Sequence, residues 1–129
     1  MGKIDKTLIT DYLKNLQEEI ITTFESLETK EKFVFKPWPY AKGEGGGKMG
    51  HLRGEVFEKA AVNFSAVSGD SLPFNKNSGH FFATGVSLIT HMANPHAPTV
   101  HMNVRYIETK DKFWFGGGYD LTPMGFYYE

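Results

Sequence analysis

The run Thr99–Glu108, with the sequence TVHMNVRYIE, decides the fold. Apolar side chains occupy its even positions from 100 to 106. The odd positions are His101, Asn103 and Arg105. Because successive side chains of a strand point to opposite faces, this alternation predicts a half-buried strand with an imidazole, a carboxamide and a guanidinium on one face. A solvated polar surface is the commoner use of such a face, and a binding surface is the alternative.

The preceding run, His80–His91, predicts a second strand of unusual shape. Its odd side chains Ala83, Gly85 and Ser87 are small, as a face must be if a bulky flat ligand is to lie on it. Beside the polar strand, this face would form a shallow floor with polar groups at one end. A bulge at Gly85 and a solvated hydroxyl at Ser87 are the structural alternatives.

Upstream, the sequence predicts one helix and an edge strand. Apolar residues recur every three or four positions from about residue 5 to 28, with Asp5 as the N-cap. The expected core-facing stripe consists of Leu8, Tyr12, Leu16, Ile20, Phe24 and Leu27. The segment Phe33–Tyr40 contains two prolines, which cannot donate to a sheet ladder, and so predicts an edge strand. The whole chain, residues 1–129, is expected to form one α+β domain with a largely antiparallel sheet flanked by helices.

Two glycine-rich segments interrupt this pattern. Residues 42–50 contain five glycines in nine positions and predict either a mobile surface loop or a loop that covers a ligand. They lack the spacing of a phosphate-binding loop. Further on, Gly116–Gly118 is expected to end a strand in a sharp turn. This turn would bring Asp120 close to a ligand, and a capping or turn aspartate is the alternative.

Composition excludes several classes of function. The chain has a net charge of −1, which favours neither nucleic acid nor an anionic membrane as a partner. It contains no cysteine, so disulfides, thiolate zinc sites and cysteine nucleophiles are excluded. No apolar run reaches the roughly 18 residues of a membrane span, and no secretory signal is visible. We expect a cytoplasmic protein.

Three histidines raise the question of a metal. His91, His96 and His101 lie five residues apart. Three imidazoles can hold a metal ion, but this spacing matches no helical or finger motif. A divalent metal is therefore the weaker interpretation of these residues.

Four separated blocks of the sequence resemble the oxygen-dependent coproporphyrinogen III oxidase family. They are Val56–Ser65 (VFEKAAVNFS), Gly85–Ile89 (GVSLI), Asn94–Arg105 (NPHAPTVHMNVR) and Phe115–Pro123 (FGGGYDLTP). They occur in the family's order and cover most of residues 45–123. Two departures are Met92, where the family has a proline, and Ala61, where it has a glycine.

The resemblance implies a fold and an activity. The chain would be the N-terminal portion of a coproporphyrinogen oxidase-like domain, whose remaining segments would follow Glu129. The family has a broad antiparallel sheet between helices and acts as a homodimer. It converts two propionates of coproporphyrinogen III to vinyl groups, giving protoporphyrinogen IX in haem biosynthesis. Dioxygen is the co-substrate, no organic cofactor is used, and a divalent metal is disputed.

The resemblance also implies roles for single residues. Ser87, Asn103, Val104 and Arg105 would contact the substrate. His101 would be the proton donor, Asp120 would engage the pyrrole N–H groups, and His91 matches a metal-ligand position. Because further family segments would follow Glu129, we expect little oxidase activity from this chain alone. A non-catalytic tetrapyrrole-binding module is the alternative, and a histidine metal site with hydrolytic chemistry is the third option.

Overall fold

The computed structural model describes residues 5–72, 77 and 79–123, which form one helix and six strands. Along the chain these elements are α1 (Lys6–Leu27), β1 (Val34–Pro39), β2 (Glu44–Leu52), β3 (Phe57–Gly69), β4 (Phe81–Met92), β5 (Thr99–Thr109) and β6 (Phe113–Thr122). The polar segment of residues 68–78, in which glycine, proline and asparagine predict a loop, lies partly outside the described residues. Within the described part, no helix is long and apolar enough to cross a membrane.

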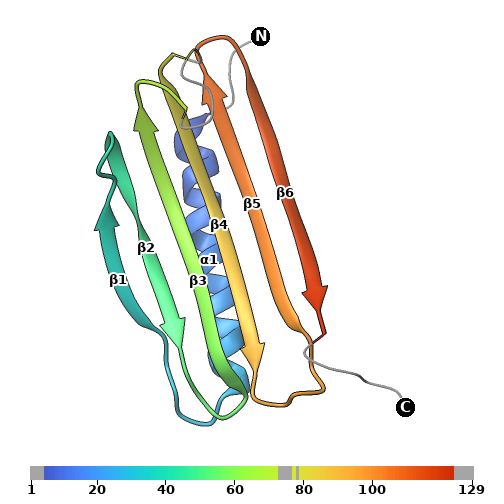
Figure 1. The fold of residues 1–129 in the computed structure, drawn as a ribbon. Coiled ribbons are helices and arrows are strands. Elements are labelled where there is room, and N and C mark those ends of the chain that lie inside the picture. Colours follow the sequence, from blue (N-terminus) through green and yellow to red (C-terminus); the bar gives the residue numbers. More distant parts are fainter. Residues whose placement is uncertain (1–4, 73–76, 78, 124–129) are drawn as a thin grey trace.

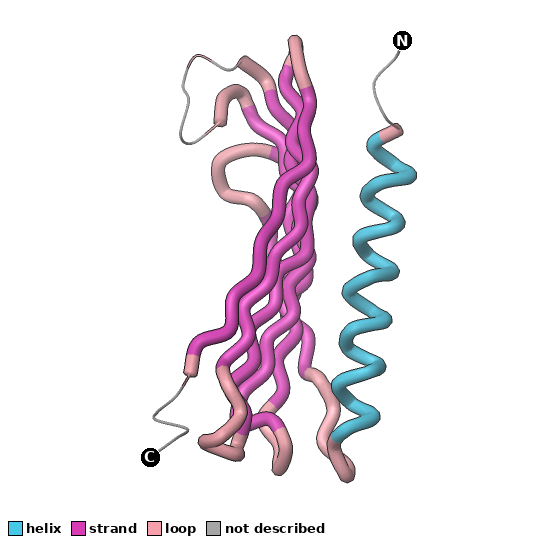
Figure 2. Tube along the Cα trace, turned by 90° about the vertical axis from the view of Figure 1, so that its right-hand side faces the viewer, coloured by secondary structure: helices cyan, strands magenta, loops and turns pink. Residues whose placement is uncertain are grey.

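The six strands form one antiparallel sheet in the order β1-β2-β3-β4-β5-β6, so each strand pairs with the next along the chain (Figure 1). This confirms the predicted α+β class and the edge position of β1. Helix α1 lies against one face of the sheet (Figure 2). Within the described residues the opposite face carries no helix. Of the helices expected on both faces of the sheet, the described residues therefore contain one, on one face.

Helix α1 begins where the sequence predicts, because Asp5 accepts hydrogen bonds from the backbone N–H groups of Thr7 and Leu8. The predicted buried stripe is wrong at its ends. Leu8 and Tyr12 are each 68% exposed, and the buried residues are instead Leu13, Gln17 and Ile21. A stripe with four-residue steps rotates about 40° beyond a full turn at each step, so its ends leave the core.

Gln17 is the buried polar residue of the helix, at 1% exposure. Its side-chain amide donates to the carbonyls of Lys48 in β2 (2.9 Å) and Val62 in β3 (3.0 Å). A buried amide without such partners would be costly, so these two bonds fix the rotation of α1 over the sheet. The predicted core-facing stripe does not include Gln17, because a pattern of apolar residues cannot identify a buried polar one.

The glycine-rich segment is not a loop, which corrects the prediction. Residues 44–52 form strand β2, paired on both sides, with β1 and with β3. The glycines are needed for close approach. A Cβ at Gly46 would lie 2.1 Å from the carbonyl oxygen of Trp38, and a Cβ at Gly47 would lie 2.2 Å from that of Phe64. Tertiary pairing therefore overrides the low strand propensity of glycine.

The predicted turn at Gly116–Gly118 is also wrong. Strand β6 continues through the three glycines to Thr122 and stays paired with β5 throughout. Asp120 is therefore a strand residue opposite His101 and not a residue of a turn. The prediction treated glycine as a strand breaker, whereas here β6 is an edge strand that follows the long strand β5.

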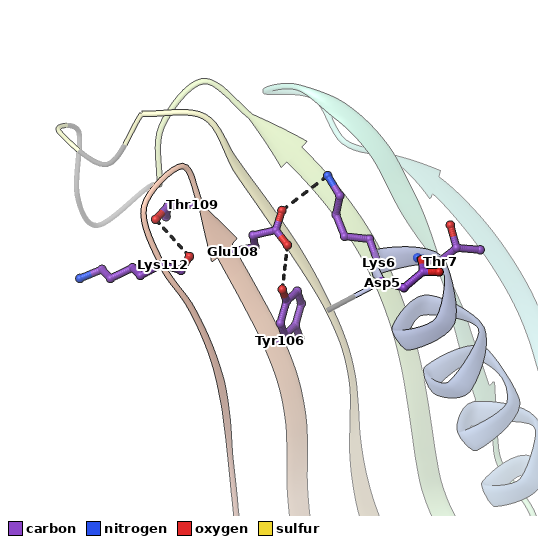
Figure 3. Close-up of polar contacts among 7 residues, drawn as sticks. All are labelled: Asp5, Lys6, Thr7, Tyr106, Glu108, Thr109 and Lys112. Atoms are coloured by element: carbon purple, nitrogen blue, oxygen red, sulfur yellow. Dashed lines mark hydrogen bonds and ion pairs between the residues drawn. The ribbon is translucent and has the colours of Figure 1, made fainter. Parts of the chain in front are cut away.

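A polar cluster joins the start of α1 to β5 (Figure 3). The hydroxyl of Tyr106 donates to Glu108 at 2.7 Å, and the ammonium of Lys6 lies 3.6 Å from the other carboxylate oxygen of Glu108. Tyr106 is fully buried. Burial, together with the hydrogen bond to Glu108 and its charge, raises the pKa of Tyr106 from 10.0 to about 12.

This raised pKa predicts a pH-dependent stability. In the unfolded chain Tyr106 releases its proton near pH 10, whereas the folded state holds it until about pH 12. The unfolded state therefore binds fewer protons between these values, and the free energy of unfolding falls as the pH rises from 10 to 12. We expect Tyr106→Phe to lose stability less steeply in this range, measured by urea unfolding. The control is Tyr12→Phe, because Tyr12 is exposed, and it should show the slope of the wild type. Equal slopes of unfolding free energy against pH in the wild type and Tyr106→Phe would contradict the assignment.

Candidate functional site

The sheet face turned away from α1 is called the open face here. It consists of the odd-numbered residues of β3, β4 and β5 and of the residues that pair with them across β1, β2 and β6. The even-numbered residues of these strands pack under α1, as Val62, Val86 and Leu88 do. The odd-numbered Ser87, Asn103 and Arg105 must therefore face the other way. The structure places Ser87, Asn103, Arg105, His101, His91 and Asp120 on the open face.

Cross-strand pairing arranges these side chains in three neighbouring rows. The first row is Val34, His51, Ala61, Ile89, His101 and Asp120. The second is Lys36, Met49, Asn63, Ser87, Asn103 and Gly118. The third is Trp38, Gly47, Ser65, Gly85, Arg105 and Gly116. The imidazole, the amide and the guanidinium thus occupy successive rows of β5, which is the arrangement that strand parity predicted.

The second and third rows border a cavity of about 370 Å³, called the trough here. Its floor is made of small residues, Ser65, Gly85 and Ser87, with Trp38 at one side and Arg105 at the other. The indole of Trp38 lies so close to Gly47 that a Cβ there would come within 2.5 Å of the ring. Glycine at position 47 therefore lets an aromatic ring form the wall of the trough.

Arg105 is exposed and has a glycine on each side, Gly85 on β4 and Gly116 on β6. A Cβ at Gly116 would be 3.6 Å from Nε of Arg105, so the guanidinium lies over this glycine. No carboxylate of the described residues pairs with Arg105. A guanidinium stays charged at physiological pH and binds a carboxylate through two parallel N–H bonds, so it can hold an anionic group of a ligand.

His101 and Asp120 form an exposed pair in the first row, next to the rows that border the trough. Nδ1 of His101 lies 3.5 Å from a carboxylate oxygen of Asp120, and the hydroxyl of Thr122 donates to the other oxygen at 3.2 Å. Both side chains of the pair are more than half exposed, at 54% and 60%. A ligand can therefore reach an imidazole and a carboxylate that are able to exchange a proton.

Two predicted site residues lie apart from this arrangement. The side chain of Val104 packs against the core under α1, so only its main chain can contact a ligand on the open face. His91 lies next to Thr99, with Nδ1 3.3 Å from the threonine hydroxyl. Among the described residues no three histidine, aspartate or glutamate side chains converge as metal ligands, so we derive no chemical step through a metal.

A larger hollow of about 710 Å³ lies on the other side of the sheet, between α1 and strands β5 and β6. Its wall is formed by apolar side chains such as Leu8, Tyr12 and Phe115. It lacks convergent polar groups, which a specific small-molecule site needs to orient its ligand. The trough on the open face is therefore the better candidate despite its smaller volume.

These features define a class: an α+β domain in which one face of an antiparallel sheet carries a trough bordered by polar side chains. Comparison with known families gives the family of this domain. The family model described as coproporphyrinogen III oxidase matches residues 8–129, and the chain belongs to the coproporphyrinogen III oxidase family.

Individual relatives support the same conclusion. An oxygen-dependent coproporphyrinogen-III oxidase of Rickettsia bellii (strain OSU 85-389) is 41% identical over 140 residues, which cover 96% of this chain and 50% of the relative. Proteins of the same name from Prochlorococcus marinus strains AS9601 and MIT 9313 are 43% and 44% identical, covering 87% and 88% of this chain and 35% of each relative. The chain thus spans half or less of the length of these relatives.

Reasoning from sequence missed several residues of the trough, among them Trp38 and Asn63. Asn63 could have been found, because it is a polar residue between the apolar Val62 and Phe64 and so faces away from the core. Trp38 could not, because its place depends on the pairing of β1 with Gly47 in a segment predicted as a loop.

Proposed function

We propose that the open face binds coproporphyrinogen III and that the chain serves its oxygen-dependent decarboxylation to protoporphyrinogen IX in haem biosynthesis. The observation that carries this proposal is the shared orientation of Ser87, Asn103, Arg105, His101 and Asp120 around one sheet face. Family membership supports the choice of substrate. A floor of small residues suits a broad macrocycle. An arginine that pairs with no carboxylate of the described residues suits one of its propionates.

The reaction requires an electron acceptor and a path for protons. At each of the two reacting propionic acid groups the carboxyl group leaves as CO₂, and the two remaining carbons become a vinyl group after the loss of two electrons and two protons. Dioxygen can accept both electrons and both protons as hydrogen peroxide, so no organic cofactor is needed to balance the step. Removing a proton from an electron-rich pyrrole ring would make the ring easier to oxidise.

The residues of the open face have roles that match this chemistry. Arg105 would hold a propionate through its planar fork of N–H groups. Asp120 would accept a hydrogen bond from a pyrrole N–H, and His101, 3.5 Å from it, would carry the proton. Ser87 and Asn103 would orient the ring above the floor of the trough.

The setting of the protein follows from the resemblance and is part of the same proposal. The family pattern favours a homodimer. The absence of cysteine suits a reducing compartment such as the cytoplasm.

A second candidate function is a tetrapyrrole-binding module without turnover. The observation that favours it is that Arg105 and the small residues of the floor line the trough, whereas His101 and Asp120 are not among its lining residues. Both candidates need the same binding surface, and they differ only in whether oxygen is consumed.

One experiment tests both candidates. Coproporphyrinogen III is titrated into the chain without oxygen, oxygen is then admitted, and oxygen uptake and protoporphyrin fluorescence are followed. We expect saturable binding. Oxygen uptake with protoporphyrin formation supports the oxidase, and binding without uptake supports the binding module. A chain that does not bind coproporphyrinogen contradicts both.

A further inference from the structure

Asn63 lies in the same row of the open face as two predicted site residues. It pairs with Ser87 across β3 and β4, and Ser87 pairs in turn with Asn103 across β4 and β5. The two asparagines are therefore two strand spacings apart, about 10 Å, on either side of one serine. All three residues line the trough.

The side-chain carbonyl oxygens of Asn63 and Asn103 share an unusual property. Among the described residues, they are the two side-chain polar atoms that are shut off from solvent and have no hydrogen-bond partner. Buried polar groups in proteins are nearly always paired, since an unpaired one has lost its water without compensation. Two such atoms in one row of one cavity therefore indicate that a bound donor completes this site.

The chemistry of the row indicates the kind of donor. A carbonyl oxygen accepts hydrogen bonds and repels carboxylates, so these two atoms would not hold a propionate of a ligand. Arg105, in the next row, is the group suited to a carboxylate. The floor of the trough is thus divided into an anion-binding side and a side that accepts N–H groups.

We propose that Asn63 is a substrate-contacting residue whose side-chain carbonyl, together with that of Asn103, accepts hydrogen bonds from pyrrole N–H groups. This inference rests on the proposed function, because it assigns a tetrapyrrole to the trough. It further predicts selectivity for the reduced ligand. Every pyrrole ring of a porphyrinogen carries an N–H, whereas half of the ring nitrogens of a porphyrin are acceptors that would face the carbonyls unfavourably.

The test compares two ligands that carry the same propionates. The affinities of the chain for coproporphyrinogen III and coproporphyrin III are measured by titration calorimetry under argon. The change of their ratio when Asn63 is replaced reports the contact with the ring nitrogens, because charge effects act on both ligands alike. We expect Asn63→Leu to lower the ratio of the coproporphyrinogen affinity to the coproporphyrin affinity by about tenfold. This is the upper range for the contribution of one neutral hydrogen bond. Asn63→Asp keeps the acceptor and should keep the ratio.

Two further variants guard the interpretation. Asn15→Leu makes the same chemical change at an exposed position of α1 and should leave both affinities unchanged. Asn63→Ala is measured beside Asn63→Leu, so that the ratio is still obtained if the larger side chain prevents folding.

The outcomes separate the two proposals. If the wild-type chain binds both ligands but Asn63→Leu or Asn63→Ala changes both affinities equally, or neither, then Asn63 has only a structural or water-binding role and the inference is overturned. The proposed function would stand in that case. If the wild-type chain binds neither ligand, both proposals are overturned.

Discussion

Replacing Arg105 by alanine is expected to weaken the binding of coproporphyrinogen III by about 10- to 100-fold. The guanidinium lies between two glycines at the side of the trough and has no carboxylate partner among the described residues. A hydrogen-bonded charge pair with a propionate would contribute about 1.5–3 kcal/mol, which corresponds to this loss. Arg105→Lys keeps the charge but loses the planar fork, so it should recover only part of the affinity.

The control is Arg53→Ala, because Arg53 is the other arginine of the chain and is exposed near the end of β2. Anaerobic titration calorimetry of the three variants gives the affinities directly. Equal affinity in wild type and Arg105→Ala would show that the open face does not hold a propionate at this position. A loss of equal size in Arg53→Ala would show that only the overall charge matters.

Replacing Glu28 by alanine is expected to reduce the free energy of unfolding by about 3 kcal/mol or more. The buried carboxylate follows α1 and accepts three backbone hydrogen bonds, from Glu55 (2.9 Å), Val56 (3.0 Å) and Phe57 (2.7 Å). A hydrogen bond to a charged group contributes about 1.5–3 kcal/mol, and its loss leaves buried N–H groups unpaired. Such a loss is a large part of the 5–15 kcal/mol that typically stabilises a domain.

The local structure supports this magnitude. A Cβ at Gly54 would lie within 2.4–2.6 Å of the carboxylate atoms of Glu28, so the turn before β3 is built around this group. Urea unfolding of Glu28→Ala, with the exposed Glu19→Ala as a matched control, measures the effect. A change below about 1 kcal/mol in Glu28→Ala would mean that water replaces the carboxylate.

The elements that sequence predicted well are those whose signal is local. The span of α1, its N-cap at Asp5 and the alternation of β4 and β5 depend on periodicity and capping, which neighbouring residues determine. The open face followed from the same alternation. The cross-strand pairing of its residues did not follow from this alternation, because pairs such as Asn63 with Ser87 depend on the register between strands.

The failed predictions for β2 and β6 share one physical cause: glycine was treated as a residue that does not form strands, because its strand propensity is low. Strand β2 and the end of β6 are strands because neighbouring strands supply their hydrogen bonds, and glycine is used where another backbone or a ring comes close. The prediction that Asp120 follows a turn was wrong for this reason. The burial of Gln17 was missed similarly, because its partners are carbonyls of β2 and β3 that no local pattern reveals.

The position of the ligand can be measured by NMR, using the side-chain N–H signals as labels of the two faces. Asn63, Asn103 and Arg105 lie on the open face, and the side-chain amide of Gln17 lies under α1 on the other. Coproporphyrin III, whose ring current displaces nearby signals, is added to the ¹⁵N-labelled chain. We predict large shifts of the three open-face signals and none of Gln17. Shifts of Gln17 with the open-face signals unmoved would contradict a ligand site on the open face.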